Sequence, residues 1–314
     1  MSKKKNKKMK RDLVNVFLFF IFLIHSSNTK KNGEKPTIHL VSYFDCITRK
    51  EFEDNPYVQK VLKFSKMMHL YGWKIVEYGN SQSESEADEF VEILSGEEFK
   101  NLPKMEKEKK YVEKLKPEIT KRVEKEDLIL HFDLLDGSIV SETMKAFHLS
   151  WVMKKEEKMM FSQIFESYAW LHYRYGSARS QGKNFDFVIP GFFDLKDWKV
   201  TSMHLSSDKP IAFLTDHYRE SKSIKKFKKI LEILPQRNFR ISGQGDFDHF
   251  FAGYSNVVDY GSILNSKEKK IQFLQGSVAL LITDDFLDSH RNIIYEAQMM
   301  GMFSNHFFNF FNNF

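Results

Sequence analysis

The chain has 314 residues, enough for one large domain or two ordinary ones, and an apolar fraction of 42% is sufficient for a packed core. A formal net charge of +6 and a pI near 9.0 would suit a nucleic-acid-binding protein. The positive charge is concentrated in residues 1–36, however, and the rest of the chain is slightly acidic. The folded part is therefore not expected to bind nucleic acid.

Residues 1–36 form a basic N-terminal tail that contains one apolar run, Leu13–Ile24. This run is short for a bilayer span, which needs about twenty residues. Its flanks are typical of a signal peptide or of an uncleaved signal anchor, and both interpretations stay open. We expect association with a membrane or the secretory pathway (ER/Golgi), or a cytoplasmic protein if the segment is not functional. Cys46 is the only cysteine, so an intrachain disulfide is excluded.

From residue 37 onward the sequence alternates between strand-like and helix-like segments. Helical spacing of apolar residues predicts a helix over 57–72, and Gly72 is a natural end for it. The charged region 80–126 is expected to be mostly helical and solvated. The expected strands of this part are 37–44, 73–79, 128–132 and one within 185–193.

The alternation becomes regular from residue 208. Strands are expected at 209–215, 238–245, 256–261 and 277–283, and helices at 222–234, 266–276 and 291–301. In the first of these helices, apolar residues recur on one face and lysines on the other: Ile224, Phe227, Ile230, Leu231 and Leu234 are expected to point inward.

Strands separated by helices predict βαβ units and parallel sheets, so the fold class is α/β with two Rossmann-like domains. We place the first domain at 37–190, a linker at 191–207 and the second domain at 208–302. Residues 303–314 show no period and are interpreted as an Asn/Phe-biased tail. Ligands of such sheets bind beyond the carboxyl ends of the strands.

Two carboxylates follow the last expected strand. Asp288 lies in the loop after this strand, and Glu296 lies in the next helix. Both could accept hydrogen bonds from sugar hydroxyls, and the helix N-terminus beside them offers N–H groups to a phosphate. A capping Asp and an exposed helix Glu are the alternative.

The same stretch resembles the family-4-like group of GT-B glycosyltransferases. Asp288 and Glu296 are separated by seven residues, and Glu296 begins the segment "EAQMMG" (296–301). Three further segments also resemble that group: "FESYAWLHYRYG" (165–176), "FDFVIPGFFD" (185–194) and "ISGQGD" (241–246). The resemblance covers most of residues 37–302. His290, Arg291 and Asn292 replace family glycines, and the family continues with further elements where this chain has residues 303–314. The second domain is therefore expected to be truncated at its C-terminus, and the protein to be degenerate in part.

The resemblance implies where a nucleoside diphosphate sugar, the donor substrate, would bind. Lys222 would hold the diphosphate together with His217, which stands where the family has an arginine, or with Arg219. No metal and no separate cofactor are implied.

The resemblance also implies contacts to the rest of the donor. Gly243 and Gly245 would let the base approach the backbone, Asp288 would contact the donor sugar, and Glu296 would contact the ribose or the sugar. Gly243 and Gly245 are weak evidence by themselves.

His131 and Asp133 follow a strand of the first domain and could contact the acceptor or the reacting centre. With Asp288 they are the catalytic candidates, and hydrogen-bonded caps at a strand end are the alternative for the first two. The expected activity is that of a hexosyltransferase-like enzyme (EC 2.4) that moves a sugar from a nucleotide-sugar to a hydroxyl of a glycan, lipid or protein. The alternative is an inactive GT-B-like remnant that acts as a binding protein or membrane-tethered scaffold.

Overall fold

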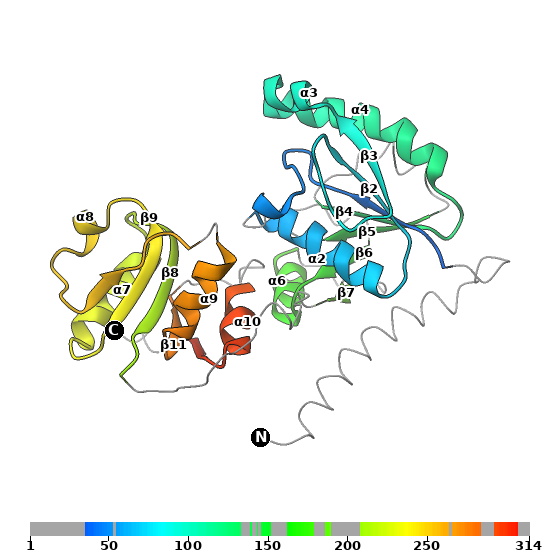
Figure 1. Ribbon diagram of the computed structural model, residues 1–314. Helices are drawn as coiled ribbons and strands as arrows, with labels where there is room; N and C mark the ends of the chain where they lie inside the picture. The colour runs from blue at the N-terminus through cyan, green and yellow to red at the C-terminus, as the bar shows by residue number, and fades with distance from the viewer. Residues whose placement is uncertain are drawn as a thin grey trace, which may run out of the picture. The chain divides into compact units, whose positions relative to one another are not determined.

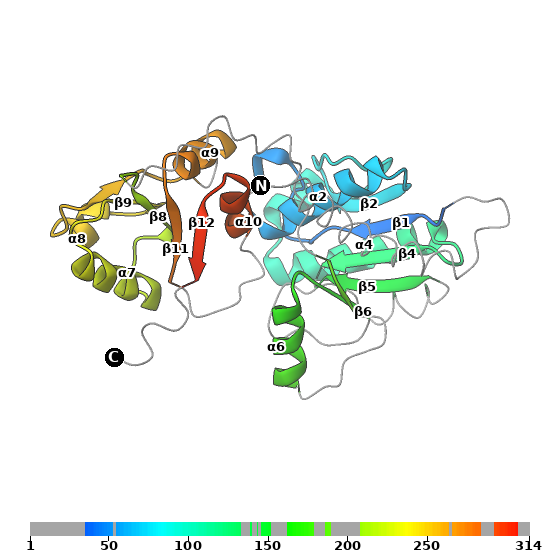
Figure 2. The same ribbon diagram turned by 90° about the horizontal axis from the view of Figure 1, so that it is seen from below.

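The computed structural model describes residues 35–52, 55–132, 139, 143, 146–151, 162–178, 186–189, 208–263, 266–283 and 292–306. The chain divides into two compact units, Met1–Phe192 and Phe193–Phe314. Each unit contains one parallel sheet with helices packed against it (Figures 1 and 2). Among the described residues, none of the helices is both long and apolar enough to cross a membrane.

The first unit contains a seven-stranded sheet in the order β3-β2-β1-β4-β5-β6-β7, and every neighbouring pair is parallel. Its strands are β1 (Ile38–Val41), β2 (Ile75–Asn80), β3 (Glu89–Leu94), β4 (Leu128–Phe132), β5 (Phe147–Trp151), β6 (Ser162–Phe165) and β7 (Phe187–Val188). The order runs outward from β1 in both directions, as in a Rossmann fold.

Helices cover both faces of this sheet. One core cluster joins the strands to α4 (Lys104–Arg122), and a second cluster joins them to α2 (Pro56–Leu70). The alternation of β1 side chains explains the arrangement, since Leu40 packs in the α2 cluster and Val41 in the α4 cluster. The shorter elements of the unit are the 3-10 helix η1 (Lys50–Phe52), α3 (Gly96–Asn101) and α6 (Tyr168–Ala178).

The ends of α2 follow from its sequence. The Asn55 side chain caps the helix by accepting a hydrogen bond from the backbone N–H of Tyr57, and Pro56 occupies the first turn. Gly72 just beyond the helix has a φ of +68°, a conformation that glycine adopts without strain.

The second unit repeats the architecture with a five-stranded parallel sheet in the order β10-β9-β8-β11-β12. Its strands are β8 (Ile211–His217), β9 (Phe239–Gln244), β10 (Val257–Asp259), β11 (Ala279–Ile282) and β12 (Phe303–His306). Helix α7 (Lys222–Ile233) covers one face, and α9 (Lys267–Gln275) and α10 (Asn292–Met299) cover the other. The short helix α8 (Phe247–Phe251) packs with the α7 cluster.

Some elements differ from the sequence prediction. Region 80–126 contains β3 as well as helices, because "EFVEIL" places Val91, Ile93 and Leu94 in the core within a charged stretch. Strands β5 and β6 were not predicted. Residues 303–306, expected as part of a biased tail, form β12 and pair in parallel with β11. The prediction of two Rossmann-like α/β domains is confirmed.

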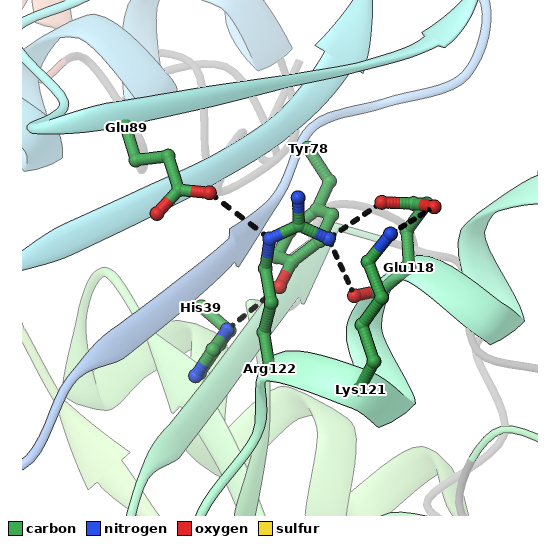
Figure 3. Close-up of polar contacts among 6 residues, drawn as sticks. All are labelled: His39, Tyr78, Glu89, Glu118, Lys121 and Arg122. Carbon is green, nitrogen blue, oxygen red and sulfur yellow. Dashed lines mark hydrogen bonds and ion pairs between the residues drawn. The ribbon is translucent and has the colours of Figure 1, made fainter.

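A buried polar network joins the strands of the first unit near the amino ends of β1 and β4, and Figure 3 shows its contact between His39 and Tyr78. Asp127, which precedes β4, lies 3.3 Å from Nε2 of His39 in β1, and the other ring nitrogen lies 2.8 Å from the Tyr78 hydroxyl in β2. The Asp127 carboxylate also accepts hydrogen bonds from the backbone N–H groups of Thr37 and Glu124, each at 2.8 Å. The network therefore ties three adjacent strands together.

Charged side chains of α4 and β3 surround the same tyrosine. Arg122 donates to Glu89 at 3.0 Å and to Glu118 at 2.5 Å. Burial raises the pKa of the Tyr78 hydroxyl well above its ordinary value. Burial also acts to raise the pKa of Asp127, but the hydrogen bonds from His39, Glu124 and Thr37 outweigh it and lower that pKa below 3.8.

We expect Asp127→Asn to lower the free energy of unfolding of the first unit at pH 7 by about 1–3 kcal/mol, because a charged acceptor is lost. Since folding lowers the Asp127 pKa, its contribution is full above the ordinary value and disappears as the pH falls. The wild-type and variant stabilities should therefore converge as the pH falls below about 4, the ordinary pKa of an aspartate. Urea unfolding followed by tryptophan fluorescence measures this, because three of the four tryptophans, Trp73, Trp151 and Trp170, lie in the first unit; Trp198, in the second unit, is replaced by Phe in every protein compared.

Glu86→Gln is the matched control, since Glu86 is an exposed carboxylate of the same unit. Equal pH profiles for Asp127→Asn and the wild-type protein would contradict the role given to the network.

Candidate functional site

The second sheet has a point where the chain leaves two neighbouring strands in opposite directions. β8 leads to α7 on one face, and the adjacent strand β11 leads towards α10 on the other face. Loops at the carboxyl ends of two such strands diverge and leave room for a ligand. The candidate site is therefore the region at the carboxyl ends of β8 and β11.

Three cationic candidates lie at this edge. His217 is the last residue of β8, Arg219 lies in the following turn, and Lys222 is the first residue of α7. All three are exposed. Ser221 caps α7 by accepting a hydrogen bond from the backbone N–H of Ile224 at 3.1 Å. The first-turn N–H groups and the three cationic candidates thus gather at one helix N-terminus, an arrangement that favours an anion.

A β-bulge precedes these residues. Leu214 pairs with Ser242 of β9, but His217 pairs with Gln244, so β8 contains one residue more than β9 over this interval. Bulges reorient the side chains that follow them. Here the extra residue lies opposite Gly243 and determines on which face of the sheet the side chains of His217 and Tyr218 lie.

Tyr218 is a buried residue of the site edge that the sequence analysis missed. Its ring lies over Gly243, where an added Cβ would come within 2.6 Å of the ring atom Cε1. Its hydroxyl donates to Asp259 at the end of β10 at 2.7 Å. Burial, with a smaller contribution from this hydrogen bond, raises the pKa of Tyr218 far above its ordinary value.

Tyr218 also gives the two glycines of β9 and its following turn a structural reason. Gly243 leaves space for the tyrosine ring, and Gly245 has a φ of +116°, which an L side chain rarely adopts. A role for Gly243 and Gly245 in approaching a nucleotide base stays a prediction. No local pattern in the sequence indicates this packing, because Tyr218 follows the end of β8 and its position over Gly243 depends on the register and the bulge.

A pair of hydroxyls joins the two sides of the site. Ser223 in the first turn of α7 and Thr283, directly after β11, lie 2.5 Å apart through their side-chain oxygens. Thr283 also lies 3.1 Å from the carbonyl oxygen of Ser223. The start of α7 and the start of the segment after β11 are thereby held together. Asp288, in that segment, lies outside the described residues.

Glu296 is described, and it is not the exposed helix residue of the alternative interpretation. It is 2% exposed in the second turn of α10. Its Oε2 lies 3.6 Å from Nζ of Lys270 in α9. Lys270 was not among the predicted site residues, because it belongs to the charged run "KEKK".

The first unit has its own polar residues near the carboxyl ends of its strands. His131 is buried in β4, as the fourth of its five residues. Lys60 of α2 forms a buried ion pair with Glu166, which directly follows β6 and belongs to the "FESYAW" segment. Asp133 lies outside the described residues. In the part of the chain that the structure describes, no group of three or more His, Cys, Asp or Glu residues could hold a metal ion.

Comparison with known proteins places this architecture. Neither a family model nor a curated protein sequence matches the chain. Solved structures do match, among them sucrose-phosphate synthase from Thermosynechococcus elongatus, with a TM-score of 0.60 and 14% identity over 86% of this chain and 80% of that one. The lipopolysaccharide outer core galactosyltransferase WaaB matches with a TM-score of 0.56 and 13% identity over 85% of this chain and 79% of that one.

A third match is HepE from Anabaena, whose structure was solved in complex with UDP-glucose; the TM-score is 0.53 and the identity 12% over 85% of this chain and 79% of that one. The fold of the chain is the GT-B fold of glycosyltransferases.

We expect Gly243→Ala to lower the stability of the second unit by about 1–3 kcal/mol, because the new methyl group would overlap the Tyr218 ring. Hydrogen exchange of the β8 and β9 amides should become correspondingly faster. Gly253→Ala is the control, since an added Cβ at Gly253 meets no atom within 4 Å. Equal exchange rates in the two variants would show that the packing of the Tyr218 ring does not require a glycine at position 243.

Proposed function

We propose that the protein is a glycosyltransferase that moves a sugar from a nucleoside diphosphate sugar to a hydroxyl acceptor. The observation that carries the proposal is the cationic N-terminus of α7 at the carboxyl ends of β8 and β11, within a GT-B fold. The similar solved structures include a galactosyltransferase, and another of them, HepE, was solved in complex with UDP-glucose. Donor, nucleotide and acceptor are not set by the fold.

In this proposal the diphosphate binds at the start of α7. The free N–H groups of the first turn and the helix dipole favour its negative charge. Lys222, with His217 or Arg219, adds charge-assisted hydrogen bonds to the phosphate oxygens. The same groups would stabilise the negative charge that develops on the nucleoside diphosphate as the glycosidic bond breaks. The positively charged side chains provide the compensating charge, so the proposal includes no metal.

The carboxylates would bind the hydroxyl groups of the donor. Asp288 is assigned to the sugar, and Glu296 to the ribose or the sugar. A carboxylate accepts hydrogen bonds through both oxygens and therefore suits a pair of neighbouring hydroxyls. His131 and Asp133 of the first unit are assigned to the acceptor or the reacting centre, and the strand position of His131 near the carboxyl end of β4 supports this assignment.

The test is a calorimetric titration of the full chain with UDP, UDP-glucose, GDP and GDP-mannose. We expect saturable binding of one nucleotide and of the corresponding nucleotide-sugar. Lys222→Ala should weaken the binding of both about tenfold through the loss of a charge-assisted hydrogen bond. Lys229→Ala is the matched control, because Lys229 is an exposed lysine near the other end of α7. The double variant Asp288→Ala/Glu296→Ala should bind the nucleotide and the nucleotide-sugar with the same affinity.

A folded wild-type protein that binds none of the four compounds would refute the proposal for these donors. Binding without transfer to any acceptor would instead favour the second candidate, an inactive GT-B-like binding protein. One observation favours that candidate, namely that an exposed His217 stands where the resembling family has an arginine. A histidine is charged only in part near pH 7 and neutralises a leaving group less well than an arginine.

A further inference from the structure

The buried carboxylate of Glu296 has an unusual environment. Its Oε2 is inaccessible to solvent and forms no hydrogen bond with another described residue. The neighbouring residue Ala297 and Met300 lie in the apolar cluster that α9 and α10 share. An ionised carboxylate in such a place needs a compensating charge, because burial without one costs several kcal/mol.

Lys270 supplies that charge from the adjacent helix. Its Nζ lies 3.6 Å from Oε2 of Glu296, and its side chain is only 17% exposed. At this distance the ammonium group attracts the carboxylate but lies beyond the usual range of a hydrogen bond to it. Lys270 thus compensates the charge of Glu296, and Oε2 of Glu296 keeps the capacity to accept a hydrogen bond.

The ion pair of the first unit differs in this respect. Lys60 donates a hydrogen bond to Oε1 of Glu166, whereas Lys270 donates none to Oε2 of Glu296. Both pairs are buried and both link a helix lysine to a carboxylate.

We propose that Lys270 is a positioning residue for donor binding: it orients Glu296 so that this carboxylate accepts hydrogen bonds from neighbouring hydroxyls of the nucleotide-sugar. The inference rests on the proposed function, because it needs Glu296 to contact the donor. Lys270 acts through Glu296 and does not itself contact the sugar. Its neighbour Lys269, in the same run, is exposed and has no such role.

The experiment compares UDP-glucose binding by the full chain and its variants in calorimetry. Lys270→Met, which keeps the apolar stem and removes the charge, should weaken binding at least tenfold. Lys270→Arg should restore affinity to within about threefold, because it restores the positive charge. Lys269→Met, the matched control, should bind as the wild-type protein does.

A double-mutant cycle separates positioning from a purely structural role. Because Lys270 acts through Glu296, the double variant Lys270→Met/Glu296→Gln should bind UDP-glucose no more weakly than Glu296→Gln alone. If the effects on affinity are additive, Lys270 does not act through Glu296 and the inference is overturned. The inference also fails if Lys270→Met binds as well as Lys269→Met.

Failure of the proposed function gives a different result. If the wild-type protein binds none of the nucleotides and nucleotide-sugars, the proposed function and the positioning role fall together. The same cycle is then measured without ligand, from the hydrogen exchange of the α10 amides. Coupling in that measurement alone would leave the pair as a purely structural ion pair, which also overturns the positioning role.

Discussion

The whole candidate site depends on the parallel pairing of β8 with β11. Parallel neighbours send their loops to the same edge of a sheet, and here the two loops lead to helices on opposite faces. The N-terminus of α7 and the start of the segment after β11 are therefore brought together by the pairing of the two strands. The hydrogen-bonded hydroxyls of Ser223 and Thr283 fix the distance between them. A shift in this pairing would displace each candidate donor-binding group in the second unit.

The two units solve the same burial problem with different polar interactions. In the first unit, a network near the amino ends of the strands uses His39, Asp127 and Tyr78 to join three strands. In the second unit, Tyr218 joins β8 to β10 across a glycine near the carboxyl ends. The first network lies at the end of the sheet away from the expected ligand edge, so it serves stability. The second lies directly beside the cationic residues and therefore connects core packing with the site.

Much of the architecture could be predicted from the sequence because local periodicity determines it. Of the five positions expected to point inward, four are buried, since a 3.6-residue period places them on one face of α7: Ile224, Phe227, Ile230 and Leu231. The fifth, Leu234, lies just after the helix and is partly buried against the same core cluster. The strand β3 was missed because its glutamates give "EFVEIL" the composition of the charged region around it. Strand β12 was missed because its four residues contain only one strongly apolar side chain.

The site could be predicted in part. Lys222 and Glu296 lie on the helices that the sequence assigned to them, because each position follows from a local pattern. The roles of Tyr218 and Lys270 could not be foreseen, since each depends on a partner in another element. Tyr218 meets Asp259, forty-one positions later, and Lys270 meets Glu296 on the next helix. Such partners become visible only when register and helix rotation are known.

Because of the β-bulge between Leu214 and His217, the positions of the side chains that follow depend on the number of residues at this strand end. Side chains of a strand alternate between its two faces, so removal of one residue here would exchange the faces of all those that follow until the turn. Tyr218 would then leave its place over Gly243, and His217 would turn inward. A change of side chain at this edge is therefore compatible with the packing of Tyr218 on Gly243, whereas a change in the length of the strand end is not.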